Sequence, residues 1–361
     1  MAGRSPVTCA VAGGNFHQFV VSYGPTGEAQ SFAFKRLFSS HLPQFLLDMS
    51  LFSLNRRHLL TLSASALSLP AMALSSRPGR LVVVGGAEDR LKDKIILRRF
   101  LSLCGGENAN IVVLTAASAD PGAAWRAYEQ VFLELGATRV SHLMIQTPDD
   151  ARSPDTLNQI LSGDGIFMSG GDQRRLMERL LDTEAARAMH TAFHLRRCCI
   201  GGTSAGAAVM SRIMLAEGGT PVLPKKDVAV LEEGLGFVPG AIIDQHFSER
   251  RRLGRLMSVL AQRPDLLGVG IDEDTALIIE RGTGVEVVGK GTVTLIDGRR
   301  MRSNFGAAAA SEHLEMLGVT LHVLPAGNRY SSLIDESGNG RLPASLRSAL
   351  TELVAPGPIR G

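Results

Sequence analysis

Short apolar segments alternate with amphipathic segments over the middle of the chain. Those rich in aliphatic residues read as buried strands and fall at 80–86, 110–118, 139–145, 165–172 and 198–204. Segments with helical periodicity lie between them, at 89–106, 124–136, 153–163 and 173–197, and Ser153 is placed to cap the third. Continuous apolar strands separated by helices indicate a parallel sheet covered on both faces. We therefore predict an α/β fold with a mainly parallel sheet and helices on both faces.

The pattern changes near residue 264. From there "GVGIDEDTALIIE", "GVEVVGKGTVTLIDG" and "LEMLGVTLHVLPAGNRY" predict strands with few helices between them. They fit either an antiparallel part of the same sheet or a small appended layer.

The N-terminal region has the pattern of an export signal. Arg56 and Arg57 precede an apolar run of 11 residues, Leu59 to Leu69, and Pro70 and the small-residue site "AMA" follow. This run is too short to span a bilayer, which takes about 20 residues, and "NRRHLL" is similar to a twin-arginine signal. We expect a signal over 49–73 and a single domain over 74–361. The extension over 1–48 is either a mis-called start, with Met49 the true one, or a genuine cytosolic tail.

Charge and cysteine content exclude several classes of protein. The net charge of +3 comes from residues 1–73, and the remainder holds 33 basic and 33 acidic residues, so nothing favours nucleic acid or an anionic membrane surface as a partner. Three cysteines lie beyond the signal, and the adjacent Cys198 and Cys199 should point to opposite faces of a strand. They do not form a disulfide framework.

The segment "GTSAG", Gly202 to Gly206, fits the G-x-S-x-G elbow between a strand and a helix. A sharp bend there exposes the Ser204 hydroxyl at the carboxyl edge of the sheet. The N–H of Ala205, at the start of the helix, is placed to stabilise an oxyanion. A plain turn is the alternative interpretation, but the strand before and the helix after favour a nucleophile.

A nucleophilic serine needs a base, and His246 is the best-placed histidine. It comes directly after the short apolar run "GAIID" and Gln245, so it lies at the carboxyl end of a predicted strand. Proteins with parallel sheets place their binding and catalytic sites at that edge. His190 and His194 have the i, i+4 spacing of a metal pair, but no third ligand is evident. We predict no metal and no cofactor.

Charged residues near these strand ends indicate substrate contacts. Arg250, Arg252 and Arg255 follow His246 closely, and guanidinium groups bind carboxylates in bidentate fashion, so they predict a carboxylate clamp on a helix starting near Ser248. "SGGDQ" at 169–173 places backbone N–H groups and Gln173 at another strand end. The acidic turns at 88–89 and 272–274 could hold cationic groups. A solvated surface is the alternative for all these charges.

Taken together, "GGDQ", "GGTSAGAAVMS", "DQHFSERRRLGRL" and "GVGIDEDTAL" resemble the cyanophycinases in their order and separations. Those enzymes belong to the serine peptidase family that also contains aspartyl dipeptidase (peptidase E), and the resemblance covers about residues 80–330. It implies a fold like that of class I glutamine amidotransferases. The roles it implies are Ser204 as nucleophile, His246 as base and Glu217 as acid, with Ala205 and Gly171 at the oxyanion. The substrate-binding residues it implies are Gln173, Asp244, Gln245, Arg250, Arg252 and Arg255.

The resemblance implies an exported serine exopeptidase. It would cut the poly-aspartate backbone of cyanophycin, which carries arginine on each β-carboxyl, to β-Asp-Arg dipeptides. We expect a secreted or periplasmic homodimer without a membrane span. An Asp-X dipeptidase of the same family is the alternative. An α/β-hydrolase esterase, with its histidine late in the chain, and a peptide-binding protein without activity fit less well.

Overall fold

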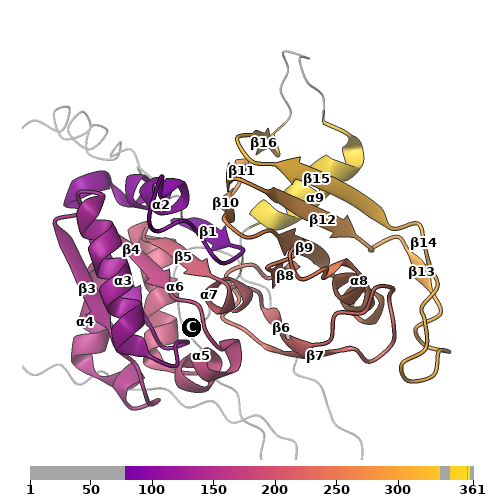
Figure 1. Cartoon of the computed structure of the whole chain (residues 1–361), viewed down its shortest axis with the longest axis horizontal. Coiled ribbons are helices and arrows are strands. Elements are labelled where there is room, and N and C mark those ends of the chain that lie inside the picture. The colour runs from indigo at the N-terminus through magenta and orange to yellow at the C-terminus, as the bar shows by residue number, and fades with distance from the viewer. Residues whose placement is uncertain (1–77, 334–341, 356, 358–361) are drawn as a thin grey trace, which may run out of the picture. The chain divides into compact units, whose positions relative to one another are not determined.

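The computed structural model describes residues 78–333, 342–355 and 357, which are coloured in Figure 1. The chain divides into Met1–Ala71 and Met72–Gly361, and all described residues belong to the second unit. The expected extension and export signal, 1–73, lie outside the described residues. No helix among the described residues is long and apolar enough to cross a membrane.

The larger sheet has eight strands in the order β16-β11-β10-β1-β5-β4-β2-β3. Its parallel part comprises β1 (Arg80–Val84), β5 (Cys199–Thr203), β4 (Gly165–Met168), β2 (Asn110–Leu114) and β3 (Arg139–Leu143). An antiparallel part comprises β10 (Thr275–Glu280), β11 (Gly284–Gly289) and β16 (Arg329–Ser331). The predicted α/β fold is thereby confirmed, and β10 and β11 from the C-terminal half do extend the same sheet.

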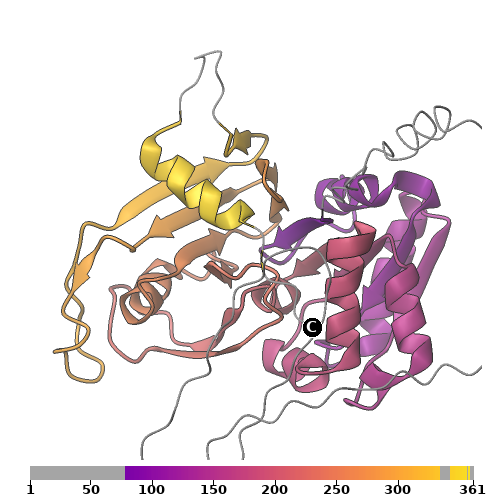
Figure 2. The same cartoon turned by 180° about the vertical axis from the view of Figure 1, so that it is seen from behind.

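Helices cover both faces of the parallel part (Figures 1 and 2). The helices α2 (Ile95–Cys104) and α3 (Pro121–Glu134) pack on the face of Val82 and Val84. The helices α4 (Pro154–Ser162), α5 (Gln173–Leu180) and α6 (Glu184–Arg196) pack on the face of Leu81 and Val83. Alternate residues of one buried strand therefore belong to separate apolar clusters, as the period of a strand requires.

A second sheet of four strands holds most of the remaining C-terminal segments. Its order is β15 (Thr320–Pro325), β12 (Thr292–Asp297), β9 (Leu267–Ile271) and β8 (Ala241–Gln245). Only β8 and β9 are parallel, so the carboxyl ends of these two strands lie side by side. The helix α8 (Leu253–Gln262) covers one face of this sheet, and Val269, Leu295 and α9 (Ala344–Val354) join the core shared with the larger sheet. The two interpretations of the C-terminal half thus each hold for part of it.

The remaining described strands form small ribbons. These are β6 (Ile213–Gly218) with β7 (Ala229–Glu233), and β13 (Arg302–Ser303) with β14 (Met316–Leu317). The very short helix α7 (Ala205–Ala208) directly follows β5.

The predicted helices differ most from the structure at three places, and the helix expected over 124–136 also begins earlier, at Pro121, because Asp120 caps it. The helix expected from residue 89 begins only at Ile95, because the Asp89 carboxylate accepts the backbone N–H groups of residues 91–94 and holds them in a turn. The segment 173–197 is two helices rather than one, since Thr183 caps a new start. The helix expected near Ser248 begins at Leu253. By contrast, Ser153 accepts the N–H of Thr156 and caps α4 as predicted.

Candidate active site

Ser204 lies on a strained bend between β5 and α7. Its φ of +52° is in a region that residues other than glycine rarely adopt. The Ser204 N–H still donates to the carbonyl of Val84 at 3.1 Å, so the bend begins directly after the parallel ladder. The Ser204 carbonyl accepts N–H groups from the first turn of α7. The strain and its supports are those of a nucleophile elbow.

The glycines of the elbow are required by close packing. A Cβ on Gly202 would lie 2.4 Å from the carbonyl oxygen of Gly206, and one on Gly206 would lie 2.5 Å from that of Met168. A larger residue at Gly202 would collide with the start of α7, and one at Gly206 would push α7 away from the neighbouring strand β4. The G-x-S-x-G spacing therefore follows from backbone contact distances.

The side chain of His246 contacts the Ser204 hydroxyl. It follows β8 directly, has a φ of +48°, and its Nε2 lies 2.9 Å from the Ser204 Oγ. The sequence prediction that these two side chains meet agrees with this geometry.

Glu273, in the turn between β9 and β10, holds the other nitrogen of the imidazole. Its Oε1 lies 2.5 Å from His246 Nδ1. A carboxylate at Nδ1 assigns the proton to that nitrogen, which leaves Nε2 free to accept the serine proton. Ser204, His246 and Glu273 thus form a continuous hydrogen-bonded chain.

Glu217, which the sequence analysis expected at this position, lies elsewhere. It is on β6, its side chain is 67% exposed, and it pairs with Arg174 at 2.7 Å. The resemblance places the acid shortly after the nucleophile in the chain, which pointed to Glu217. A better signal was available: "GIDED" ends an apolar strand after the histidine, and β9 runs parallel to β8, so Glu273 emerges beside His246.

The pKa of His246 is lowered from its ordinary value of 6.5, mainly by burial. The hydrogen bond to Glu273 opposes this shift, while the positive charges of Arg250 and Arg252 add to it. The imidazole is therefore neutral near pH 7, the state that a general base requires.

The glycine turn after β4 approaches the nucleophile from the other side. A Cβ on Gly170 would be 3.4 Å from the Ser204 Cβ, and the φ of Gly171 is +145°. A side chain at Gly171 would collide with the Ala117 carbonyl, at 2.1 Å. The two residues named for the oxyanion, Ala205 and Gly171, thus belong to the elbow and to the turn that packs against it.

Two of the three arginines do not form the expected carboxylate clamp. Arg255 binds both carboxylate oxygens of the buried Asp244, with its Nε 3.0 Å from Oδ2. Arg252 reaches the same carboxylate at 3.4 Å and the Gln245 side chain at 2.5 Å. Both guanidinium groups are buried and already paired, so they hold the end of β8 against the start of α8 instead of facing solvent.

Arg250 differs from these two arginines. It is exposed, and its charge acts on His246. It is the member of the arginine trio that stays available to a substrate. The Gln173 side chain, like that of Arg252, is already hydrogen-bonded within the protein. Its amide donates to the Ala216 carbonyl at 2.5 Å, which connects α5 to β6.

A cavity of about 450 Å³ opens beside Ser204 and His246. Glu88 lies in its wall, is 5% exposed, and accepts hydrogen bonds of 2.5 Å from the hydroxyls of Tyr128 and Thr203. Burial, and then Glu88, raises the pKa of Tyr128 well above its usual range. Arg90, also in the wall, lies over the Tyr128 ring, 5.4 Å from its centroid.

The other acidic turn residues of the sequence analysis serve the fold. Asp89 caps its own turn, Asp272 accepts bonds from Ser248 and Thr292, and Asp274 pairs with Lys290. Among the described residues no group of three His, Cys, Asp or Glu side chains could hold a metal ion. His190 is buried, with Nε2 2.8 Å from the Leu235 carbonyl, and its ring stacks on that of His194.

Fold and geometry together define an α/β serine hydrolase with the arrangement used for acyl transfer. A model described as peptidase family S51 matches residues 81–287, and the chain belongs to this family of serine-type peptidases. The cyanophycinase of Geminocystis herdmanii is 39% identical over 252 residues, which are 70% of this chain and 93% of that protein. The cyanophycinase of Synechococcus elongatus is 37% identical over 289 residues, 80% of this chain and 89% of that protein.

The crystal structure of a peptidase from an acI-B1 actinobacterium has the same fold. It superposes with a TM-score of 0.50 at 22% identity, over 71% of this chain and 97% of that one.

The two glutamates can be separated by matched substitutions. Glu273→Gln should lower kcat on a peptide substrate by about 10³- to 10⁴-fold with little change in KM, because the amide favours the wrong imidazole tautomer and no longer stabilises its protonated form. Glu217→Gln should stay within about twofold of the parent. Steady-state kinetics on variants of equal melting temperature test this, and a kcat loss confined to Glu217→Gln would reinstate the original assignment.

The charge of Arg250 should shift the acidic limit of activity, which burial of His246 mainly sets. Protonated His246 cannot act as base, so kcat/KM should rise with pH through the pKa of His246, with a midpoint below 6.5. Arg250→Ala removes a positive charge that disfavours the protonated ring, so it should move the midpoint to higher pH. Arg251→Ala, the same loss at the adjacent exposed residue, serves as control. Equal midpoints in the parent and in Arg250→Ala would contradict this reading.

Proposed function

We propose that this serine peptidase hydrolyses the poly-aspartate backbone of cyanophycin and releases β-Asp-Arg dipeptides. The observation that carries the proposal is the Ser204–His246–Glu273 chain beside a cavity with both acidic and basic groups in its wall. The two cyanobacterial relatives described above, which carry the name cyanophycinase, support the choice of substrate.

The charges of the cavity suit the substrate. Arginine joined through its α-amino group to a β-carboxyl keeps a free guanidinium and a free α-carboxylate, so every repeat is a zwitterion. Each Glu88 oxygen accepts one hydroxyl and retains a lone pair for a guanidinium N–H. Asp120 adds a second carboxylate at the cavity. Arg90, in the cavity wall, and the exposed Arg250, which lies outside that wall, are suited to the α-carboxylate.

The reaction is an acyl transfer to Ser204. The Ser204 Oγ attacks the backbone carbonyl as its proton passes to His246 Nε2, and Glu273 stabilises the resulting imidazolium. The N–H groups of Ala205 and Gly171 receive the oxyanion. His246 then protonates the leaving amine, and water, deprotonated by the same nitrogen, hydrolyses the ester and restores the serine.

Release of dipeptides from a chain end, rather than cleavage at internal bonds, is part of the proposal, as is export. The polymer is too large to be taken up whole, so a cell that feeds on it from outside needs its peptidase outside the cytoplasm. The signal pattern at 49–73 supports this. The homodimer expected from the commonness of twofold assemblies stays a prediction, which light scattering on the purified chain can test.

Two substrates distinguish the proposal from its alternatives. Purified protein incubated with cyanophycin should release β-Asp-Arg, which mass spectrometry detects. Ser204→Ala should lower kcat by about 10⁶-fold. Asp-Leu should be cut far more slowly. Efficient cleavage of Asp-Leu with no attack on cyanophycin would instead identify an Asp-X dipeptidase, and no labelling of Ser204 by a serine-reactive probe would indicate a binding protein.

Export predicts a processed N-terminus. In the native host, mass spectrometry of the protein outside the cytoplasm should find a chain beginning shortly after Ala73, because signal peptidase cuts after small residues. If the twin-arginine route is used, the double substitution Arg56→Lys and Arg57→Lys should keep the precursor in the cytoplasm. A mature chain that retains residues 1–48 would refute both the signal and the start at Met49.

A further inference from the structure

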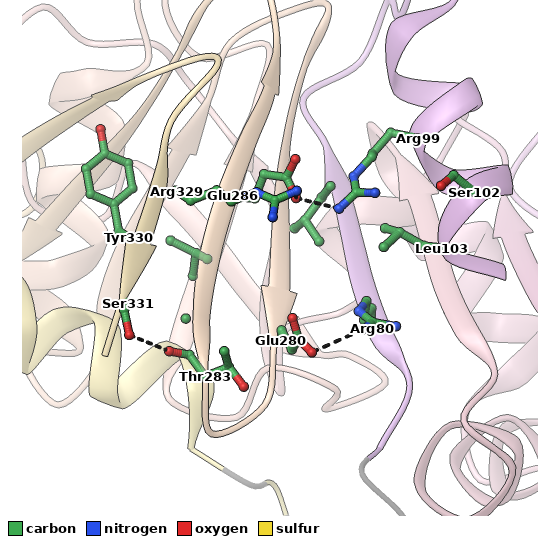
Figure 3. Close-up of a pocket in the computed structure, with 13 residues that line it drawn as sticks. Arg80, Arg99, Ser102, Leu103, Glu280, Thr283, Glu286, Arg329, Tyr330 and Ser331 are labelled. Carbon is green, nitrogen blue, oxygen red and sulfur yellow. Dashed lines mark hydrogen bonds and ion pairs between the residues drawn. The ribbon is translucent and has the colours of Figure 1, made fainter. Parts of the chain in front are cut away.

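A second charged groove lies apart from the active site, between α2 and the antiparallel strands β10, β11 and β16 (Figure 3). It consists of two adjoining cavities of about 500 and 560 Å³, which share Arg99, Ser102, Glu286 and Arg329. None of its lining residues lines the catalytic cavity. We call it the arginine–glutamate groove.

Acidic and basic side chains alternate across this groove. Arg80 and Glu280 are directly opposed on β1 and β10, and their side chains pair at 3.1 Å. Further along, Glu286 accepts from Arg99 at 2.8 Å and from Arg329, its cross-strand partner, at 3.1 Å. Figure 3 shows the first and second of these pairs side by side along the groove.

The Arg80–Glu280 pair and the contact of Arg329 with Glu286 are weak enough to exchange partners. The Arg80 and Glu280 side chains are each 35% exposed and that of Arg329 is 70% exposed. Ion pairs in such exposed positions contribute little to stability because water competes for both ions. The groove can therefore open the Arg80–Glu280 pair and release Arg329 at little cost to a ligand that offers replacement charges. Arg99 and Glu286, whose side chains are 29% and 19% exposed, form its more enclosed pair.

Arginine is in excess over glutamate. Arg98 is exposed in the second cavity, so the groove holds four arginines (80, 98, 99 and 329) against two glutamates (280 and 286). The Arg99 Nε is buried without a hydrogen-bond partner among the described residues. A fitting ligand thus carries carboxylates for the surplus arginines and cations for the two glutamates, repeated along its length.

We infer that this groove binds a distant stretch of the polymer whose end is being cut at Ser204. The inference rests on the proposed function, since each cyanophycin repeat displays one carboxylate and one guanidinium. A second attachment on the same polymer raises the effective concentration of chain ends at the active site. The groove would therefore improve the use of granules and long chains while leaving the chemistry at Ser204 unchanged.

Charge reversal in the groove tests this in an inactive background. Ser204→Ala protein is sedimented with cyanophycin granules at low and at moderate salt. Adding Arg98→Glu and Arg329→Glu should weaken binding about tenfold or more and flatten its salt dependence. Both positions are exposed, so folding should persist. Arg300→Glu with Arg302→Glu, a double reversal at two exposed arginines outside the groove, is the matched control with the same change of charge and should bind like the parent.

Kinetics with Ser204 restored separate this inference from the proposed function. The groove variant should cut a soluble trimer of the repeat within twofold of the parent, yet need about tenfold more granules for half-maximal rate. If the parent does not cut cyanophycin at all, the proposed function fails. If it does, but the groove variant binds and uses granules like the parent, only the groove assignment fails. A change of oligomeric state in the variant would make the groove a contact between copies and would likewise overturn it.

Discussion

The geometry of the site depends on two glycines that join the two sheets. Gly85 and Gly86 follow β1, the strand beside the one that carries Ser204, and their carbonyls accept the N–H groups of His246 at 2.7 Å and Asp274 at 2.9 Å. A Cβ on Gly85 would lie 2.1 Å from the Asp272 carbonyl oxygen, and one on Gly86 would lie 2.3 Å from the His246 ring. The base and its carboxylate partner therefore reach the nucleophile only because no side chain separates the sheets here.

Strain and burial are concentrated around that junction. Ser204 and His246 both have positive φ, and each is held by a backbone hydrogen bond to the segment Val84–Gly85. Behind His246, Asp244 and its two arginines form a buried ion cluster. Removing one member of such a cluster leaves an uncompensated charge, which typically costs about 3–5 kcal/mol. Arg252 and Arg255 therefore act on the base by fixing the end of β8, and the charges of Arg250 and Arg252 lower the pKa of His246.

The catalytic cavity and the arginine–glutamate groove both combine acidic and basic side chains, but they hold these side chains differently. At the catalytic cavity, Glu88 is buried, fixed by two hydroxyls and set beside the nucleophile, which suits selection of one side chain. In the arginine–glutamate groove the paired ions are partly exposed, from 19% for Glu286 to 70% for Arg329, which suits loose contact with many equivalent repeats. One polymer can therefore have a single side chain held firmly at the catalytic cavity while its other repeats bind loosely in the groove.

Local sequence determined the parallel α/β sheet, the elbow at Ser204 and the strand-end position of His246. Each depends on short-range properties: apolar periodicity, glycine spacing and the end of an apolar run. The identity of the carboxylate partner depended on which strands are neighbours, since β8 and β9 pair only in the folded chain and bring Glu273 to His246. The availability of the arginines likewise depended on burial against Asp244, because an i, i+2, i+5 spacing on a turn and helix start does not reveal which members face the core. Pairing and burial are long-range properties, so only the tertiary structure decided them.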